Sequence, residues 1–377
     1  MPDIAARTAA VVVVYRLAQD IRPTLLALQR TVRHVLLVDN HEQGHPGLPG
    51  LAAQVGADYL HAGNRGGLAG AYNRAVERLR HRHPQTQQLV FLDEDSDPSS
   101  LAALLRDAAT GRILAQAGTG AVAPAYRDRA TGMRGRYIRL GRYRLRFNPR
   151  EFGGMRQVAF VINSMSVWRW QSLQQIGPFN EALAVDHVDT EYCLRARQLG
   201  LALYVNGEFE FAHSIGERKK YRVLGRELQA GGHGPERRFM IARNTVWLAR
   251  NWCWREPAFA ALCLARLAYE AVGILMAEDR ALAKLAALAR GTASGLVARQ
   301  RPDLKPLRRT CQGERAPSAR CAHCCRWPPG PPTPRWASST PRGCWRSCWR
   351  QPASGSSADG RRPGSNPDRP SCSGFWP

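Results

Sequence analysis

Two short stretches of this 377-residue chain concentrate the side chains that perform metal and acid–base chemistry. The first is Asp93-Glu94-Asp95, and the second runs from Asp186 to Arg195 as Asp-His-Val-Asp-Thr-Glu-Tyr-Cys-Leu-Arg. Two carboxylates one residue apart can hold a hard divalent cation and leave positions open for phosphate oxygens. A further carboxylate can accept a proton from a hydroxyl group. The two stretches therefore favour metal-assisted chemistry, with His213 as a candidate third ligand.

Each of these features also has a structural interpretation. Acids in the first turn of a helix complement its macrodipole, which alone could account for the second stretch. Ser96, Asp97 and Pro98 favour a solvated turn after the first stretch. A lone histidine such as His213 is most often structural, unless a carboxylate pair needs a further ligand. A metal or acid–base site can therefore form only where the helices and strands of the fold bring these side chains together.

A segment of small residues, Asn64-Arg-Gly-Gly-Leu-Ala-Gly-Ala-Tyr-Asn73, opens a predicted helix. Glycine and alanine allow a ligand or a neighbouring strand to approach the backbone closely. The glycine spacing differs from that of a dinucleotide fingerprint, and the segment does not end in the Gly-Lys-Ser/Thr of a P-loop.

Apolar, β-branched runs alternate with helix-like segments over the first hundred residues. The predicted strands are 9–15, 35–38, 57–60 and 89–92, and the predicted helices are 22–30 and 67–80. This alternation indicates an α/β fold with a doubly wound sheet. Ligands bind at the carboxyl edge of such sheets, where Asp93 and Asp95 follow their strand.

Nine arginines lie from Arg127 to Arg150, most of them two or three residues apart. Within this region, 142–147 alternates arginine with apolar residues, which predicts a strand with one basic and one apolar face. Such a face could be solvated, could contact a lipid-diphosphate acceptor or an anionic leaflet, or could bind nucleic acid. Further along, the sequence predicts a strand at 158–162, a helix at 186–198 and a pair of short strands within 201–211.

From 257 to about 296 the pattern becomes helical and rich in Ala and Leu. The segment 259–276 is nearly apolar, but Arg266 and Glu270 interrupt it, so a full membrane span is not expected. Two interpretations remain open, an amphipathic helix that lies on an anionic membrane surface and a plain packing helix.

The composition changes abruptly near the end of the chain. The formal net charge is +24, and the part from Lys305 onward holds thirteen basic and three acidic residues, which leaves +14 before it. Seven of the ten cysteines also lie there, among Arg, Pro, Ser, Gly and Trp without hydrophobic periodicity. This tail is predicted not to fold, or to be translated out of frame. Cys321-Ala-His-Cys-Cys has no second ligand pair at finger-like spacing, so no zinc site is expected.

Together these segments resemble the family-2 glycosyltransferases of the GT-A fold, most closely their bacterial rhamnosyltransferase-like branch. The resemblance covers about residues 9–296. The matching segments are Val38-Asp39-Asn40, Asn64 to Asn73, Phe91-Leu-Asp-Glu-Asp-Ser96, Ile176-Gly-Pro-Phe-Asn180, Val188-Asp-Thr-Glu-Tyr-Cys-Leu-Arg-Ala196, His213-Ser-Ile-Gly216 and Arg243-Asn244. The resemblance implies a Rossmann-like, mostly parallel central sheet flanked by helices, with a C-terminal helical extension.

The resemblance also assigns roles residue by residue. Asp189 matches the general base, and Glu191 and Arg195 match its supporting residues. The implied ligands of Mg²⁺ or Mn²⁺ are Asp93, Asp95 and His213. The implied nucleotide-sugar-binding residues are Tyr15, Asp39, Asn64, Gly67, Asn73, Asp93 and Asp95, with Asp39 on the nucleotide base.

Three positions depart from the family pattern. Arg16 stands where the branch usually has Asn, and Glu94 stands where Gln is common. Met165 follows Ser164 where a small Gly is usual, which questions the shape of the acceptor pocket but not the reaction class.

The implied activity is an inverting, metal-dependent transfer in a single displacement. The resemblance suggests L-rhamnose from dTDP-L-rhamnose, or a sugar from another dTDP- or UDP-sugar. The acceptor would be a hydroxyl of a cell-surface glycan, as in polysaccharide or lipopolysaccharide biosynthesis, or of a lipid-diphosphate-linked molecule. One rival is a catalytically impaired scaffold on the same fold. The other is a basic nucleic-acid-binding protein, although no helix-turn-helix, finger or RNA-recognition signature accompanies the charge.

We predict a nucleotide-sugar glycosyltransferase domain over 1–255, an amphipathic extension over 256–303 and a low-complexity tail over 304–377. The high positive charge implies an anionic partner. The three scattered cysteines before the tail, Cys193, Cys253 and Cys263, favour a reducing compartment. The first residues show no signal-peptide pattern, so we expect a cytoplasmic protein, peripheral on the inner face of the membrane.

Overall fold

The computed structural model describes residues 4–129, 131–213, 219–223, 226–230 and 232–298. The predicted tail, 304–377, and the motif residues 214–216 lie outside the described residues.

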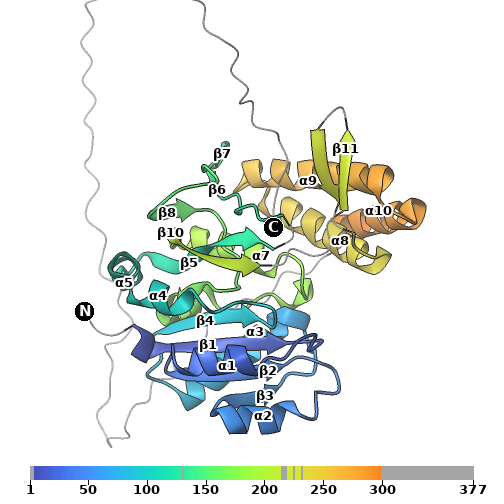
Figure 1. Ribbon diagram of the computed structural model, residues 1–377. Coiled ribbons are helices and arrows are strands. Elements are labelled where there is room, and N and C mark those ends of the chain that lie inside the picture. The colour runs from blue at the N-terminus through green and yellow to red at the C-terminus, as the bar shows by residue number, and fades with distance from the viewer. Residues whose placement is uncertain (1–3, 130, 214–218, 224–225, 231, 299–377) are drawn as a thin grey trace, which may run out of the picture. The chain divides into compact units, whose positions relative to one another are not determined.

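An eight-stranded sheet forms the centre of the fold, in the order β3-β2-β1-β4-β9-β5-β10-β8 (Figure 1). Its strands are β1 (Thr8–Val14), β2 (His34–Asp39), β3 (Asp58–His61), β4 (Gln88–Asp93), β5 (Thr119–Asp128), β8 (Met155–Val158), β9 (Val167–Arg169) and β10 (Ala202–His213). Among the described strands of this sheet, β8 and β9 run antiparallel to their neighbours, and the other six run parallel to one another. The predicted α/β fold with a mostly parallel central sheet is therefore confirmed.

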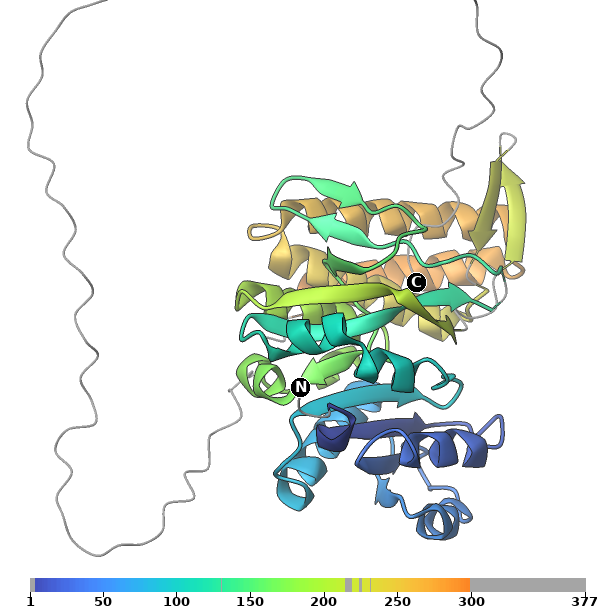
Figure 2. The ribbon, with the colours of Figure 1, turned by 60° about the vertical axis from the view of Figure 1, so that its left-hand side comes forward.

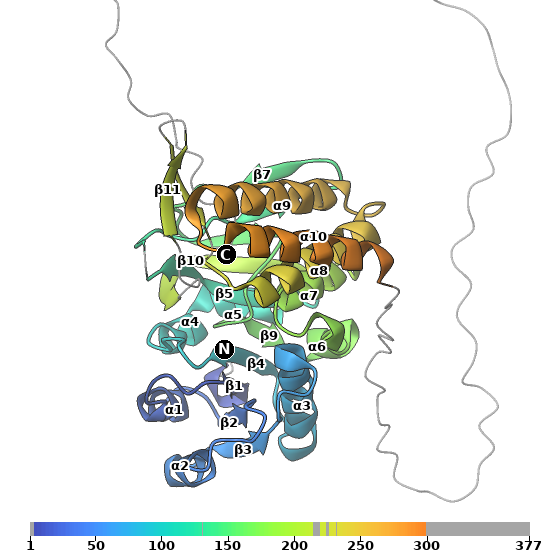
Figure 3. The ribbon, with the colours of Figure 1, turned by 90° about the vertical axis from the view of Figure 1, so that its right-hand side faces the viewer.

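Helices lie on both faces of the sheet, as Figure 3 shows in a nearly edge-on view. On one side are α1 (Arg22–Gln29), α2 (Leu48–Val55) and α4 (Leu101–Arg106), and on the other are α3 (Gly67–Arg82) and α6 (Trp170–Ile176). The remaining helices of this part are α5 (Ala108–Ala115), α7 (Val188–Gln198) and the 3-10 turns η1 (Ala5–Arg7) and η2 (Glu181–Leu183). Every residue of β1 is buried, as expected for an apolar strand between two helical layers.

The C-terminal extension consists of helices that pack against one another beside β10 (Figures 1 and 2). These are α8 (Pro235–Trp252), α9 (Pro257–Ala277) and α10 (Ala281–Val297), with a hairpin of β11 (Lys219–Val223) and β12 (Arg226–Ala230). A second hairpin, β6 (Ile138–Leu140) and β7 (Leu145–Phe147), adjoins α9, because the Ala258 N–H donates to the Arg142 carbonyl oxygen at 3.2 Å.

Several local predictions were wrong in detail. The strand expected at 142–147 is only Leu145–Phe147, because Gly141 to Arg144 form the turn of the hairpin. The strand expected at 158–162 ends at Val158, since the Ala159 N–H bonds instead to the Ile138 carbonyl.

Two further boundaries near the site also differ from expectation. The pair of strands expected within 201–211 is the single strand β10, with an irregularity between Asn206 and Glu210. The helix expected from 186 begins at Val188, because His187 adopts a left-handed backbone with φ of 69°.

The strand register brings the candidate residues to one edge of the sheet. Val13 of β1 pairs with Asp93, and Val14 pairs with Asp39. On the other half of the sheet, His213 at the end of β10 pairs with Asp128 at the end of β5. Since β9 is antiparallel to both β4 and β5, these two strands run in the same direction, and both sets of residues share the carboxyl edge.

Candidate active site

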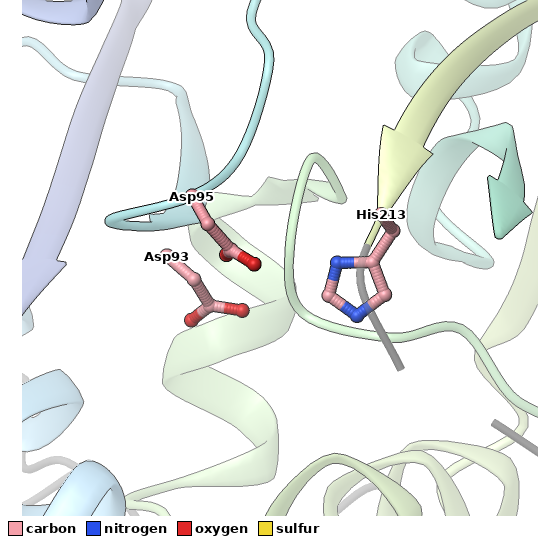
Figure 4. A group of neighbouring side chains, drawn as sticks. All are labelled: Asp93, Asp95 and His213. Atoms are coloured by element: carbon pink, nitrogen blue, oxygen red, sulfur yellow. The ribbon is translucent and has the colours of Figure 1, made fainter. Parts of the chain in front are cut away.

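Asp93, Asp95 and His213 form a cluster at this edge (Figure 4). One ligand atom from each residue lies within 4.8 Å of the others, although the two acids and the histidine are more than a hundred positions apart. The three side chains are half-buried. Two carboxylates and an imidazole are a donor set suited to Mn²⁺ or Mg²⁺.

The residues present fit a divalent cation. Nδ1 of His213 is buried and accepts or donates no hydrogen bond among the described residues. Burial raises the pKa of the Asp93 carboxyl, and the Asp95 carboxylate raises it further, against the opposing effects of His213 and Ser164. A cation would remove the repulsion between the two carboxylates and give the imidazole nitrogen a partner.

Hydrogen bonds fix the position of Asp93. The Oγ atoms of Ser96 and Ser164 lie 3.0 and 3.3 Å from the Asp93 backbone nitrogen, and they lie 2.6 Å from each other. Ser164 is 3% exposed, so the hydroxyl groups that hold the end of β4 lie inside the fold. The solvated turn considered for 96–98 is therefore wrong for Ser96, which is 2% exposed.

Tyr72 of α3 is a site residue that the sequence analysis missed. Its side chain is 1% exposed, and its hydroxyl forms a hydrogen bond with the Asp93 carboxylate. Burial, followed by the charges of Asp93 and Asp189, raises the pKa of this phenol well above 10, so it is a donor at every working pH. Its place within the small-residue segment 64–73 was the available signal.

Asp189 lies in the first turn of α7 and lines a cavity of about 200 Å³. The Thr190 backbone N–H donates to Asp189 Oδ1 at 2.7 Å. Burial raises the pKa of the Asp189 carboxyl, and the charge of Asp93 adds to the rise. Asp189, the candidate base, and Asp93, a candidate metal ligand, are therefore close enough for their ionisation to be coupled.

The loop before α7 is held by the Arg243-Asn244 pair of α8. Asn244 Nδ2 donates to the carbonyls of Leu183 and Asp186 at 2.9 and 3.0 Å. Arg243 donates to the Ala182 carbonyl at 2.6 Å. This motif therefore positions the segment that presents Asp189, and it does so through backbone carbonyls.

Glu191 and Arg195 form a buried ion pair away from the cavity lining. Their closest N–O distance is 2.9 Å, and Arg195 also donates to the carbonyls of Ile176 and Pro178. Burial raises the pKa of Glu191, and the Arg195 charge opposes this rise. That the two residues support Asp189 remains a prediction. In the structure, the hydrogen bonds of Arg195 tie α7 to the Gly177-Pro178 turn.

Asp39 is fully buried at the end of β2, and protein donors surround its carboxylate. His45 contacts it through its backbone N–H at 2.5 Å and Nδ1 at 2.9 Å, and Tyr59 and the His41 N–H complete the set. Burial would raise its pKa, but these hydrogen bonds outweigh burial and lower the pKa. A contact with a nucleotide base, which remains a prediction, would require one of these donors to move.

Tyr15 and Asn64 are linked by a third residue, Glu42, to which both side chains donate. Tyr15 donates to Glu42 Oε1 at 3.2 Å, and Asn64 Nδ2 donates to the same oxygen at 2.6 Å. Tyr15 is 39% exposed, which leaves its ring open to a ligand. The structure therefore brings these two predicted donor-binding residues together, with Glu42 as an unpredicted partner.

Gly67 and Asn73 contact protein segments. Gly67 has φ of 62°, and a Cβ atom there would lie 2.6 Å from the Ala184 carbonyl oxygen. Asn73 exchanges hydrogen bonds with the Phe179 backbone and donates to Glu181 at 2.9 Å. Their predicted contact with the nucleotide sugar is untested, and the observed contacts hold the segment that leads to α7.

Glu94 and Met165, two of the departures from the family pattern, have defined contacts. Glu94 Oε2 accepts the backbone N–H groups of Tyr15, Arg16 and Leu17 at 2.9, 3.2 and 3.0 Å, which fixes the loop after β1. Met165 is fully buried with φ of 64°, a conformation that a glycine would adopt without strain. It is not among the residues that line the cavity beside Asp189, and its effect on an acceptor pocket stays a prediction.

Part of the chain is similar in sequence to a known protein. A 91-residue segment is 33% identical to the dTDP-rhamnosyl transferase RfbF of Shigella flexneri, over 24% of this chain and 30% of that protein. The match thus spans less than a third of the relative's length. No protein-family model matches the chain. This similarity agrees with the predicted resemblance to rhamnosyltransferase-like glycosyltransferases.

Solved structures that match part of the chain include two synthases. Mannosyl-3-phosphoglycerate synthase from Rubrobacter xylanophilus is 16% identical with a TM-score of 0.36, over 55% of this chain and 67% of that one. Glucosyl-3-phosphoglycerate synthase from Mycobacterium tuberculosis, in complex with Mn²⁺, UDP and glucosyl-3-phosphoglycerate, is 15% identical with a TM-score of 0.32, over 58% of this chain and 74% of that one.

Proposed function

We propose that this chain is a glycosyltransferase of the family-2, GT-A type that moves a sugar from a nucleotide donor to an acceptor hydroxyl with inversion. One observation carries the proposal. The Asp93, Asp95 and His213 cluster lies at the carboxyl edge of the sheet, and the charge of Asp93 acts on both Tyr72 and the Asp189 carboxyl of α7.

A donor diphosphate needs a positive charge as it departs. Asp93, Asp95 and His213 would hold Mg²⁺ or Mn²⁺, which would stabilise the charge that develops on the leaving diphosphate. The chain's own residues prepare this site: Ser96 and Ser164 fix Asp93, and Tyr72 donates to its carboxylate.

Asp189 is the proposed base. The acceptor hydroxyl loses its proton to the Asp189 carboxylate while its oxygen bonds to the anomeric carbon and the nucleoside diphosphate leaves from the opposite face. A raised pKa makes Asp189 a better proton acceptor than an ordinary carboxylate at neutral pH. Glu191 and Arg195 are positioning residues, because Arg195, paired with Glu191 within α7, donates to the Ile176 and Pro178 carbonyls and so ties the helix to that turn.

The proposed donor is dTDP-L-rhamnose, supported by the similarity to the Shigella flexneri protein, with another dTDP- or UDP-sugar as the alternative. Tyr15, Asp39, Asn64, Gly67 and Asn73 are the proposed residues around the donor. The proposed acceptor is a glycan or lipid-diphosphate-linked hydroxyl of polysaccharide or lipopolysaccharide assembly, and the proposed location is the cytoplasm.

A donor panel tests this function. The full chain is incubated with dTDP-rhamnose, dTDP-glucose, UDP-glucose and UDP-galactose, each with Mn²⁺, Mg²⁺ or EDTA, and the released nucleoside diphosphate is measured. We expect metal-dependent release from one donor, and we expect Asp93→Asn/Asp95→Asn to abolish it. Release that is equal in EDTA would refute the metal site, and donor binding without release from any donor would favour the scaffold alternative.

A further inference from the structure

The exposed faces of α9 and α10 are almost entirely apolar. The exposed residues of α9 are Ala261, Leu264, Ala265, Ala268, Val272, Leu275 and Met276. Those of α10 are Leu282, Ala283, Ala286, Ala289, Arg290, Ala293, Leu296 and Val297. The spacing of three and four residues places each set along one side of its helix. Figures 1 and 3 show the two helices side by side.

This surface is unlike the rest of the described protein. Of the thirteen large hydrophobic side chains that are exposed, seven lie on these two helices. Leu275 is 62% exposed, Leu282 85% and Val297 75%, so most of each residue's surface is open to solvent. Soluble monomers rarely expose large apolar patches unless these contact a partner.

The buried face of α9 shows that this helix lies along the fold. By length and composition α9 could cross a membrane, with a mean hydropathy of 1.7 over its most apolar window. However, Glu270 is bonded to the buried Arg238 of α8, and Arg266 lies 3.8 Å from Glu270. A helix held by buried charges against α8 cannot span a bilayer without breaking them, so only its exposed face is available.

Basic and aromatic side chains flank the start of α9. Trp254 is 86% exposed and Tyr143, at the tip of the β6–β7 hairpin, is 72% exposed. Arg142, Arg144 and Arg255 are exposed beside them. The hydrogen bond from Ala258 to Arg142 joins the hairpin to the helix. Tryptophan, tyrosine and arginine next to an apolar helix face are typical of the boundary between lipid head groups and acyl chains.

We propose that α9, α10 and the β6–β7 hairpin dock on an anionic lipid bilayer, with both helices in the plane of the interface. The apolar faces enter the acyl boundary, and Arg142, Arg144 and Arg255 meet the acidic head groups. A second copy of the chain would complement the apolar faces but would place like charges of the two hairpins in one interface.

The docking surface also borders the cavity that holds Asp189. Ile138 and Phe147 of the hairpin and Arg266 of α9 line this cavity. The next step rests on the proposed function. An acceptor anchored in the same bilayer would reach Asp189 past the hairpin. The acceptor class would then be amphiphilic, a lipid-linked glycan and not a free sugar.

Vesicle co-sedimentation of the full chain tests the docking without donor, metal or acceptor, so its outcome is independent of catalysis. The vesicles are phosphatidylcholine alone or with 30% phosphatidylglycerol, an assay choice of roughly physiological anionic charge. The test variants are Leu264→Gln/Leu275→Gln and Arg142→Gln/Arg144→Gln. The matched controls are Leu26→Gln/Leu199→Gln, also exposed leucines, and Arg30→Gln/Arg78→Gln, also exposed arginines.

We expect anionic vesicles to bind the wild type more tightly, and each test variant to lose at least about tenfold in partitioning. The controls remove the same side chains elsewhere and keep the charge of the tail, so they should bind as the wild type does. Unchanged thermal unfolding midpoints would exclude misfolding. Equal binding by test and control variants would overturn the proposal. So would wild-type self-association, measured by sedimentation velocity without lipid, that the leucine test variant abolishes.

Discussion

Removal of the Tyr72 hydroxyl should weaken metal binding and leave the fold nearly unchanged. Tyr72→Phe keeps the ring that packs 4.4 Å from Phe91 and 5.2 Å from Phe179, measured between ring centroids. It deletes only the donor to the Asp93 carboxylate. The substitution therefore removes only the hydroxyl group by which α3 contacts the Asp93 carboxylate.

The magnitude follows from the type of hydrogen bond. A bond to a charged group contributes about 1.5–3 kcal/mol, because the carboxylate is an ion in a partly buried position. Loss of a comparable partner of a metal ligand costs about 10–100-fold in metal affinity. We expect Tyr72→Phe to raise the Mn²⁺ concentration that gives half-maximal turnover by that factor.

Tyr192→Phe is a matched control. Tyr192 is also 1% exposed and stacks on Phe179, but its hydroxyl donates to the Gly177 carbonyl at 3.0 Å. Both variants are compared by calorimetric Mn²⁺ titration, by turnover at varied Mn²⁺ and by thermal unfolding. An equal Mn²⁺ dependence for both variants would refute the assigned role of Tyr72, whatever their stability.

Three further predictions concern stability. Gly67→Ala should cost about 2–5 kcal/mol, since it combines a φ of 62° with a Cβ atom 2.6 Å from a carbonyl oxygen; Gly47→Ala, with nothing within 4 Å, should be nearly neutral, and equal urea midpoints would contradict this. Arg195→Met should cost about 3–5 kcal/mol by stranding Glu191, with partial recovery in Glu191→Gln/Arg195→Met; lost turnover at unchanged stability would instead indicate a direct catalytic role. Burial lowers the pKa of His187 to about 3, so the unfolded chain binds a proton near pH 6.5 that the folded chain refuses, and stability should fall by about 1.4 kcal/mol per pH unit from about 6.5 towards 3. The urea-derived stability of His187→Asn should lack this component, and parallel pH profiles would argue against it.

The sequence predicted the class of fold because the first four strands are apolar runs that alternate with helices. Strands in such an alternation are parallel, so their carboxyl ends share one edge of the sheet. Asp93 and Asp95 follow β4 directly, so their place could be inferred from local pattern alone. His213 could be named only as a candidate third ligand, by its residue type and by the resemblance, because nothing near it in sequence shows that β10 pairs with β5. Distant strand pairing of this kind depends on tertiary packing.

Other parts of the site could not be predicted, for physical reasons. Tyr72 looks like any apolar-face residue of α3, and its donor role depends on how close α3 packs to β4. Glu94 stood out in the sequence only as a departure from a common Gln, yet it accepts three backbone N–H groups, which a sequence cannot reveal. The strand predicted at 142–147 failed because alternation also fits a hairpin whose turn carries arginines.

The base assignment is tested most directly by Asp189→Asn, measured for transfer and for binding in the same preparation. The amide keeps the shape of the side chain and its place in the cavity but cannot accept the acceptor's proton. The account predicts that transfer falls by about 10²–10⁴ while Mn²⁺ and dTDP bind within a few fold of the wild type. Turnover within tenfold of the wild type would contradict the assignment of Asp189 as the base.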